Sequence, residues 1–223
     1  MPLGSRLRLA GGSGIAGALV FTAGWLFAHA LDPSVEYGRD YISNFGAATG
    51  EHPWVWNAAT AAAAGILILL LLAGLARALP AHGMVRLGLF ALAAAGLGTF
   101  LHGLLPLDCP LPNDSGCRAR QERGEVSWQH RAHLVESLIT VGAFVVAPLA
   151  LGRGLRGIDR WRPLAVPSLA CGLILFVLAV ALGVSEREAY VGVVQRVFAV
   201  GDDLGRGSGA PALAIRRRVG LRL

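Results

Sequence analysis

Residues 54–79 read WVWNAATAAAAGILILLLLAGLARAL, and the only charged side chain in this stretch is Arg77, near its end. A helix rises about 1.5 Å per residue, so about 20 apolar residues cross the roughly 30 Å hydrocarbon core of a bilayer. Lipid offers the backbone no hydrogen-bond partners, so a segment that crosses it must satisfy its own N–H and C=O groups, as a helix does. This stretch therefore predicts a membrane-spanning helix.

Four other apolar runs have a similar length, so the chain is expected to fold as an all-α, polytopic transmembrane helix bundle of five to six spans. A further segment begins apolar but then carries Arg196 and Asp202, which are costly inside a membrane, and several glycines that disfavour a helix. It is either a sixth span or a short interfacial segment followed by a basic tail. The expected spans, all in one membrane domain of residues 1–223, are residues 11–31, 54–79, 84–106, 132–152 and 163–183, with residues 188–215 as the sixth in the first alternative.

The composition is typical of a membrane protein. Hydrophobic residues make up 54% of the chain and charged residues 15%, whereas soluble domains carry about 25% charged residues. The formal net charge of +6 would suggest nucleic-acid binding in a soluble protein, but the arginines here lie at the ends of apolar runs. We therefore expect no nucleic-acid partner, because the sequence contains no soluble basic domain that could bind one.

The arginines also predict the orientation of the bundle. They are more numerous before the first span, around the short turn after residue 79, after the fourth span and at the end of the chain than in the two long connections, residues 32–53 and 107–131. Arginine-rich segments stay on the cytoplasmic side, so the N-terminus is expected in the cytoplasm and both long connections outside. No convincing cleavage motif follows the first apolar run, which is expected to remain as an anchor.

Two cysteines, Cys109 and Cys117, share the second long connection. Neighbouring thiols outside the cytoplasm tend to oxidise, so we expect a disulfide between them. The alternative is a pair of metal thiolates, although the spacing differs from the CxxC pattern that is usual in zinc sites.

Ionisable side chains gather where the third and fourth expected spans reach the outer side. His102 and Asp108 lie at the end of the third span. His130 and His133 open the fourth span, with Ser137 one turn deeper. Residues three or four apart share one face of a helix, so His130, His133 and Ser137 are expected to point the same way. If the disulfide ties the intervening loop down, His102 could face His133 across the helix pair.

Three interpretations of this cluster stay open. The histidines could be interfacial polar groups that neighbours and water satisfy. They could bind a divalent metal such as zinc, which neutral imidazoles and a carboxylate hold with one position open. Alternatively, His133 could be a base and Ser137 or a water the attacking group, with Asp40 converging from the first long connection. The candidate metal ligands are His102, Asp108, His130 and His133, and the intramembrane Glu136 is a further functional candidate because a charge there is costly.

The first long connection carries the candidate lipid-binding residues Arg39, Tyr41 and Ser43. A short amphipathic turn or helix is expected over residues 39–45, because the glycine that follows is a common helix terminator. Arg39 beside Asp40 could bind a lipid phosphate, or it could form a surface ion pair.

The segment RDYISNFGA (residues 39–47) and the HPWVWNAA that follows it (residues 52–59) carry a resemblance to a known family. Together with the expected spans, they resemble the bacterial membrane family called domain of unknown function 998, over about residues 10–200. More remotely, the chain is similar to the FRAG/DRAM/Sfk group, some members of which take part in remodelling glycolipid anchors. The first family has no assigned activity, so the resemblance implies an architecture and a bacterial plasma-membrane location. The matching positions are Asp40, Tyr41, Ile42, Ser43, Gly46 and Pro53, whereas Asn44 stands where an acidic residue is usual, which weakens a metal role for that loop.

Three classes of function follow from these observations. The first is an integral membrane protein with a structural, lipid-organising or regulatory role and an outward-facing polar site. Its partners would be membrane lipids, a second copy of the chain or another membrane protein. The second is a membrane-embedded enzyme, metal-dependent or not, that acts on a lipid or lipid-linked substrate at the outer interface. The third is a small-solute transporter, for which the spans carry few polar groups.

Overall fold

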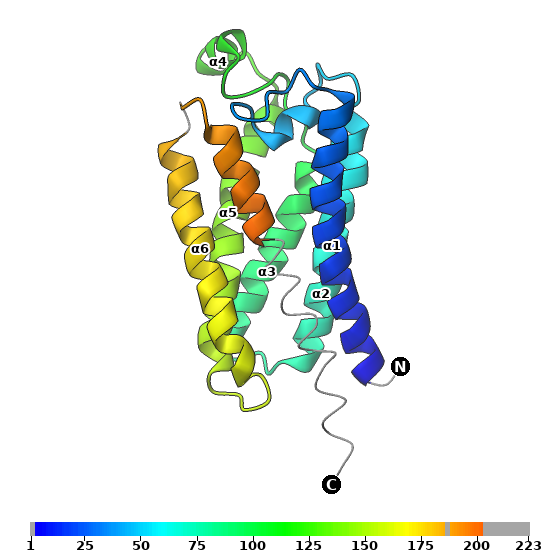
Figure 1. Ribbon diagram of the computed structural model, residues 1–223, viewed down its shortest axis with the longest axis vertical. Helices are drawn as coiled ribbons and strands as arrows, with labels where there is room; N and C mark the ends of the chain where they lie inside the picture. Colours follow the sequence, from blue (N-terminus) through cyan, green and yellow to red (C-terminus); the bar gives the residue numbers. More distant parts are fainter. Residues whose placement is uncertain (1–2, 186–187, 203–223) are drawn as a thin grey trace.

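The computed structural model describes residues 3–185 and 188–202. Every regular element in this part of the chain is a helix (Figure 1), which confirms the all-α expectation. Five helical segments are long and apolar enough to cross a membrane, and each corresponds to one of the five expected spans. These segments are Leu7–Leu31, Val55–Ala78, Gly83–His102, Trp128–Leu155 and Arg162–Val184.

Five long α-helices form the body of the molecule, and shorter helical pieces extend them or lie in the connections. The long helices are α1 (Leu3–Leu31), α2 (Ala63–Ala78), α3 (Gly83–His102), α5 (Trp128–Leu155) and α6 (Ala165–Val184). The π-helix η2 (Val55–Ala62) leads into α2, and the 3₁₀ turn η3 (Arg162–Leu164) leads into α6. The 3₁₀ turn η1 (Ile42–Gly46) lies in the first long connection, and the helix α4 (Ser115–Glu122) lies in the second.

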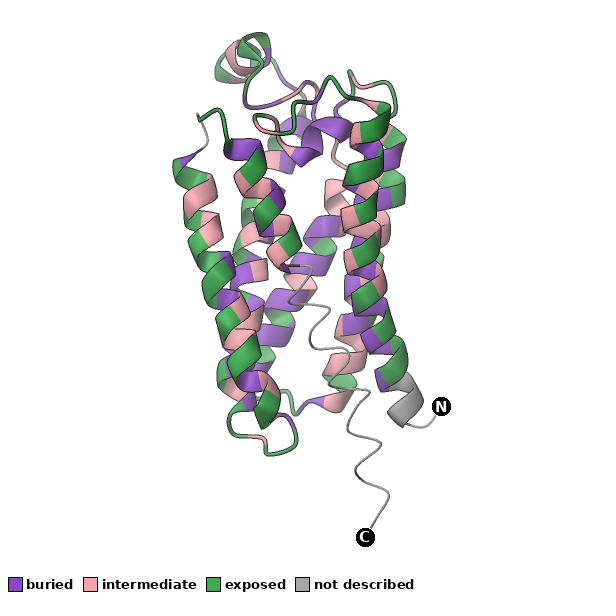
Figure 2. Cartoon of the chain, viewed as in Figure 1, coloured by how far each residue is buried: buried purple, intermediate pink, exposed green. Residues whose placement is uncertain are grey.

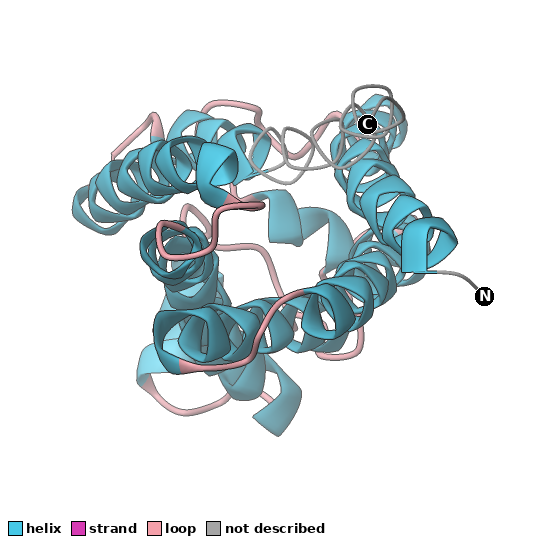
Figure 3. Cartoon of the chain, turned by 90° about the horizontal axis from the view of Figure 1, so that it is seen from below, coloured by secondary structure: helices cyan, strands magenta, loops and turns pink. Residues whose placement is uncertain are grey.

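Successive long helices pack side by side and run in alternating directions (Figure 1). Thus α1 packs on α2, α2 on α3, α3 on α5 and α5 on α6. Seen along the bundle, the helices are arranged around a common centre and not in a flat layer (Figure 3). The alternation brings both long connections to one end of the bundle, as expected, and the short turns to the other (Figure 1). We call the first of these the loop end.

Residues 191–202 form a last helix that lies between α6 and α1 (Figure 1). Its Phe198 packs in a cluster with Leu175 of α6, and its Ala199 packs against the cluster that holds Trp25 of α1. This helix is the beginning of the expected sixth segment, residues 188–215. The remainder of that segment lies outside the described residues.

Two helix boundaries differ from the expected ones and shape the site. The third span ends at His102 and not at residue 106, while α5 begins at Trp128, one turn earlier than expected. Ser127 explains the early start of α5, because its side-chain oxygen accepts a hydrogen bond from the backbone N–H of His130, 3.1 Å away. Consequently His130 and His133 both lie in the first two turns of α5.

Glycines let α3 approach both of its neighbours closely. A Cβ atom at Gly98 of α3 would overlap the hydroxyl oxygen of Thr140 on α5, and one at Gly65 of α2 would overlap the backbone of Phe100 on α3. Small residues at such crossings are the usual means by which membrane helices pack, since lipid provides no hydrophobic driving force between them. The close approach of α3 and α5 places their polar side chains within bonding distance.

The two long connections interlock at the loop end. The Asn44 side chain donates to the carbonyl of Leu111 (2.6 Å) and accepts from its N–H (2.9 Å). The backbone N–H of Ala48 donates to the carbonyl of Leu107 at 2.7 Å. The expected disulfide joins Cys109 and Cys117 and lies in a buried apolar cluster with Leu107. The helix α4, which the sequence reasoning did not anticipate, follows Asp114, whose carboxylate caps it by accepting from the backbone N–H of Cys117.

Many large apolar side chains of the long helices are exposed, and Figure 2 shows exposed positions in green along the outside of the bundle. Phe90, Leu138 and Val184 are 75%, 76% and 77% exposed, respectively. Exposing such side chains to water costs about 25 cal/mol per Å² of apolar surface, whereas hydrocarbon imposes no such cost. This surface agrees with a bundle that is surrounded by lipid.

Candidate functional site

The imidazole rings of His102 and His133 lie against each other inside the loop end of the bundle. Their centroids are 4.1 Å apart and their planes are inclined by 47°. His102 is the last residue of α3, while His133 lies in the second turn of α5 and is 3% exposed. The structure thus brings these two histidines together across the helix pair, as expected from the sequence.

Glu136 is the third member of this cluster. Its Oε2 lies 3.1 Å from Nδ1 of His102, and its Oε1 accepts a hydrogen bond from the Thr140 hydroxyl. Each of His102, His133 and Glu136 offers one ligand atom, and these atoms lie within 4.8 Å of one another. Sequence reasoning identified Glu136 as a functional candidate but did not place it among the metal ligands. The sequence spacing could have identified Glu136 as a ligand, because it follows His133 by three residues and so shares its helix face.

A backbone carbonyl fixes the proton on His133. The Nδ1 atom lies 2.5 Å from the carbonyl oxygen of Leu105, which can only accept a hydrogen bond, so Nδ1 carries the proton. In a neutral imidazole, Nε2 then keeps its lone pair. His133 is therefore held in the tautomer that can accept a proton or bind a metal through Nε2.

A π-helical turn brings an aromatic ring against His102. Trp56 in η2 is 2% exposed, and its ring lies edge-on to that of His102 with the centroids 5.9 Å apart. In the same turn, the Thr60 hydroxyl donates to the carbonyl of Val55, five residues earlier, at 2.8 Å. Such π-turns are frequent at functional sites because they displace side chains from the regular helical path. Trp56 carries no ionisable group, so sequence reasoning did not assign it to the site.

A cavity of about 110 Å³ adjoins the cluster. Ser43 of η1, His102 of α3 and Ser137 of α5 contribute polar groups to its lining. Ser137 Oγ lies 3.5 Å from Nδ1 of His102, at the outer limit of a hydrogen bond. Two other walls come from α6 and the last helix, and the last helix adds the polar side chains of Gln195 and Asp202 to apolar ones. The apolar ones include Leu182, Phe198 and Ala199.

Asp108 and His130, the other two expected metal ligands, form a separate group. The Asp108 carboxylate accepts hydrogen bonds from the Ser127 N–H and hydroxyl, both at 2.6 Å. The Asp108 N–H donates to Nδ1 of His130 at 3.1 Å. Burial raises the pKa of Asp108, but the hydrogen bonds from Ser127 and the nearby His130 and Arg120 outweigh it and hold this pKa below its usual value. The four expected metal ligands therefore form two separate pairs, His102 with His133 and Asp108 with His130.

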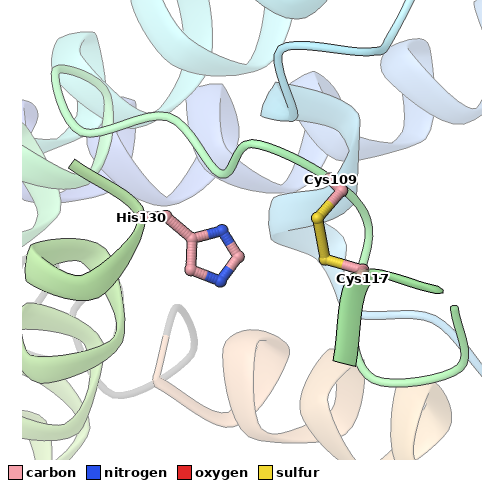
Figure 4. Close-up of side chains that lie close together, drawn as sticks. All are labelled: Cys109, Cys117 and His130. Atoms are coloured by element: carbon pink, nitrogen blue, oxygen red, sulfur yellow. A yellow bond between two sulfur atoms is a disulfide. The ribbon is translucent and has the colours of Figure 1, made fainter. Parts of the chain in front are cut away.

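His130 lies beside the disulfide (Figure 4). The residue is 0% exposed, and one of its ring nitrogens is within 4.8 Å of the sulfur atoms of Cys109 and Cys117. Metal-binding cysteines act as thiolates. In this structure the two sulfur atoms are bonded to each other, so this second group of ligand-type residues has no thiolate to offer.

The candidates of the first long connection do not converge on the histidines. Asp40, expected at the catalytic cluster, accepts hydrogen bonds from the N–H of Glu36 and the side chain of Asn113 at the molecular surface. Arg39 is exposed and pairs with Glu36 at 3.7 Å, so the surface ion pair is formed with a different acid from the expected one. Of the three lipid-binding candidates, Ser43 is the one that lines the cavity, whereas Tyr41 packs against the disulfide cluster.

The last helix is fastened to the first long connection through two side chains that sequence reasoning did not assign to the site. Gln195 accepts a hydrogen bond from the N–H of Ile42 at 2.6 Å. Arg196 is 2% exposed, and its Nη1 donates to the carbonyl of Asp40 at 2.9 Å. Its guanidinium lies over the ring of Tyr37, 4.5 Å from the centroid. The loop end and the last helix therefore enclose the cavity together.

Comparison with known proteins identifies a family to which the chain belongs. The sequence model of the family described as "Protein of unknown function (DUF998)" matches residues 15–203. Neither the comparison with curated proteins nor that with solved structures finds a match. The matched range includes the whole histidine cluster, the disulfide and the last helix. The chain belongs to the DUF998 family, for which no function is assigned.

Proposed function

We propose that this membrane protein binds a lipid-type amphiphile, a molecule with a polar group and an apolar chain, in the cavity between its helices. The lining of the cavity is the observation that supports this proposal. Thr99, His102 and Ser137 supply polar groups from α3 and α5, and Gln195 and Asp202 supply others from the last helix, while apolar side chains such as Phe144, Leu182 and Phe198 make up most of the rest. Ligand sites are typically apolar cavities with a few convergent polar groups.

The surroundings of the cavity favour a ligand that comes from the membrane. All five helical segments that are long and apolar enough to cross a bilayer contribute to its lining, together with η1 and the last helix. Their outer surfaces are apolar, so lipid molecules are the most concentrated neighbours of the bundle. We further propose that the N-terminus faces the cytoplasm of a bacterial cell, which places the polar end of the cavity in the outer half of its plasma membrane.

A second candidate function is chemistry on the bound amphiphile. The position of His102 in the cavity wall, against His133 and Glu136, favours it. A neutral His133 with a free Nε2 is suited to accept a proton, and Ser137 offers a hydroxyl near His102. Turnover of a lipid ester or amide by the purified protein, lost in His133→Ala, would distinguish an enzyme from a lipid-binding protein.

Photochemical labelling tests the proposed lipid binding. The protein would be reconstituted in vesicles that contain a phospholipid with a photoactivatable group in its acyl chain, and the labelled residues mapped by mass spectrometry. We expect labels on cavity residues such as Phe144 and Phe198 in addition to those on the outer surface.

A matched pair of variants makes this test specific. Ala199→Phe fills the cavity, whereas Ala170→Phe adds the same side chain to the exposed surface of α6. We expect Ala199→Phe to reduce labelling of the cavity residues several-fold and Ala170→Phe to leave it unchanged. Labelling confined to the outer surface, or equal cavity labelling in both variants, would contradict the proposal.

A further inference from the structure

We propose that His102, His133 and Glu136 bind a divalent metal ion, with zinc preferred, in the wall of the cavity. This inference does not depend on the proposed lipid binding, since it rests on the donor set and its geometry. Two imidazoles and one carboxylate form a donor set that zinc uses where a fourth position stays open for water or a substrate oxygen.

The distances between the donor atoms suit such a site. In a tetrahedral zinc site with bonds of about 2.0–2.2 Å, neighbouring ligand atoms lie about 3.4 Å apart. Nδ1 of His102 and Oε2 of Glu136 are 3.1 Å apart. The three ligand atoms lie within 4.8 Å of one another, so shifts of at most about 1.5 Å would close the set around an ion.

Two of the ligands are oriented by groups behind them, as metal ligands usually are. The carbonyl of Leu105 holds Nδ1–H of His133, so Nε2 is the atom that would bind the metal. The Thr140 hydroxyl holds the second oxygen of Glu136. Such partners fix the tautomer of a ligating histidine and the rotation of a ligating carboxylate. Both supports are part of α5 or of the chain just after α3, so they are present before any ion binds.

The charge of Glu136 also favours a cation at this position. Glu136 is 8% exposed and lies within the apolar segment Trp128–Leu155. A carboxylate in such surroundings is costly unless a positive charge accompanies it. Within the described residues, no arginine forms a salt bridge with Glu136, whose nearest ring nitrogen is Nδ1 of His102 at 3.1 Å. A divalent ion would offset this cost and serve both histidines at once.

The fourth position of the ion would be reached from the cavity. His102 and Ser137 both line it, and Ser137 Oγ lies 3.5 Å from the His102 nitrogen that faces Glu136. The site therefore suits an oxygen ligand, either water or a carbonyl or phosphate oxygen of a molecule in the cavity. Zinc there would polarise that oxygen as a Lewis acid.

Metal binding can be measured directly on the purified full-length protein. The protein would carry an affinity tag without histidines, be treated with a chelator, and then be titrated with zinc or cobalt(II). We expect about one tightly bound zinc per chain, a rise in the melting temperature with zinc, and an X-ray absorption spectrum with nitrogen and oxygen ligands including imidazole. A chain that binds no zinc, or one whose spectrum shows sulfur ligands, would overturn the proposal.

Variants assign the binding to these residues. Glu136→Gln keeps the shape of the side chain but removes its charge, and we expect it to weaken zinc binding at least about 10-fold. His52→Ala, on an exposed residue of the same end, is the matched control for His133→Ala and should bind as the unmodified chain does. Melting curves without zinc show whether each variant is folded. His102→Ala provides a third route if either of the others fails to fold. Unchanged zinc affinity in a folded ligand variant contradicts the metal proposal. Such a result would leave the proposed lipid binding standing, because the labelling of the cavity tests lipid binding separately.

Discussion

Individual positions on α3 and α5 decide whether polar groups can meet inside an apolar bundle. Gly98 removes a side chain where Thr140 approaches, and Thr140 in turn holds Glu136. The position of the buried Glu136 carboxylate therefore depends on Gly98, although Gly98 itself does not contact the carboxylate. A hydroxyl and an imidazole satisfy Glu136, and both depend on the spacing between the two helices.

Gly98→Ala tests this dependence. A Cβ there would overlap the Thr140 oxygen and approach Glu136 Oε1 to 3.0 Å, so either the Thr140 side chain must turn away or α3 and α5 must move apart. We expect a loss of about 1–3 kcal/mol of stability, the usual cost of overpacking. Thermal unfolding in detergent would measure it. Gly142→Ala on α5, where a Cβ would meet nothing within 4 Å, is the control and should be neutral or slightly stabilising. A Gly98→Ala protein as stable as this control would show that the close approach is not required.

The residues of the site were predictable to different degrees, for physical reasons. His102 and His133 could be paired from the sequence, because both lie near the same ends of two helices joined by one connection. Asp108 could not be placed, since its orientation depends on Ser127, which reaches it through the fold of that connection. The binding of Asp40 by Asn113 is likewise a contact between two connections that no helical period encodes.

Among the elements, the last helix is attached to the first long connection through Arg196, a residue that is costly inside a membrane. From the sequence alone, Arg196 disfavours a helix inside the bundle, because the sequence shows the charge and not its surroundings. In the structure the guanidinium donates to the carbonyls of Asp40 and Gly192 and lies over the ring of Tyr37. The five apolar spans were predictable because their length and hydropathy suffice, whereas this helix depends on distant aromatic and carbonyl groups.

Arg196→Ala should loosen the last helix from the loop end. The variant loses the hydrogen bond to the Asp40 carbonyl and the contact with the Tyr37 ring, which together are worth about 2–4 kcal/mol. Hydrogen–deuterium exchange would report this as faster exchange in residues 191–202 and in residues 36–42. Arg131→Ala, an exposed position on α5, should leave both segments unchanged. Equal exchange in the two variants would mean that other contacts hold the helix.

For the whole molecule, alternation of five helices puts the interlocked connections at one end and the short turns at the other (Figure 1). Arginines lie at both ends, and at the loop end they are Arg39, Arg118, Arg120, Arg123 and Arg131, in or next to the two long connections. At the end opposite the loop end, arginines flank the two short turns that join α2 to α3 and α5 to α6. They are Arg77, Arg86, Arg153, Arg156, Arg160 and Arg162. By the positive-inside rule, these arginines support the proposed orientation, in which the loop end lies outside the cytoplasm.

Labelling of single engineered cysteines tests this orientation in intact cells. In a Cys171→Ala background, cysteines would replace Thr49 and Glu122 at the loop end, and Ala81 and Asp159 in the short turns, all of them exposed positions. A membrane-impermeant maleimide should label the first pair in intact cells and the second pair only after the membrane is opened. Labelling of Thr49→Cys and Glu122→Cys from opposite sides would contradict the bundle itself. If instead the second pair were labelled in intact cells and the first pair only in opened cells, the bundle would be correct but inverted. The arginine-rich turns would then face outward, and the cavity would lie in the cytoplasmic half of the membrane.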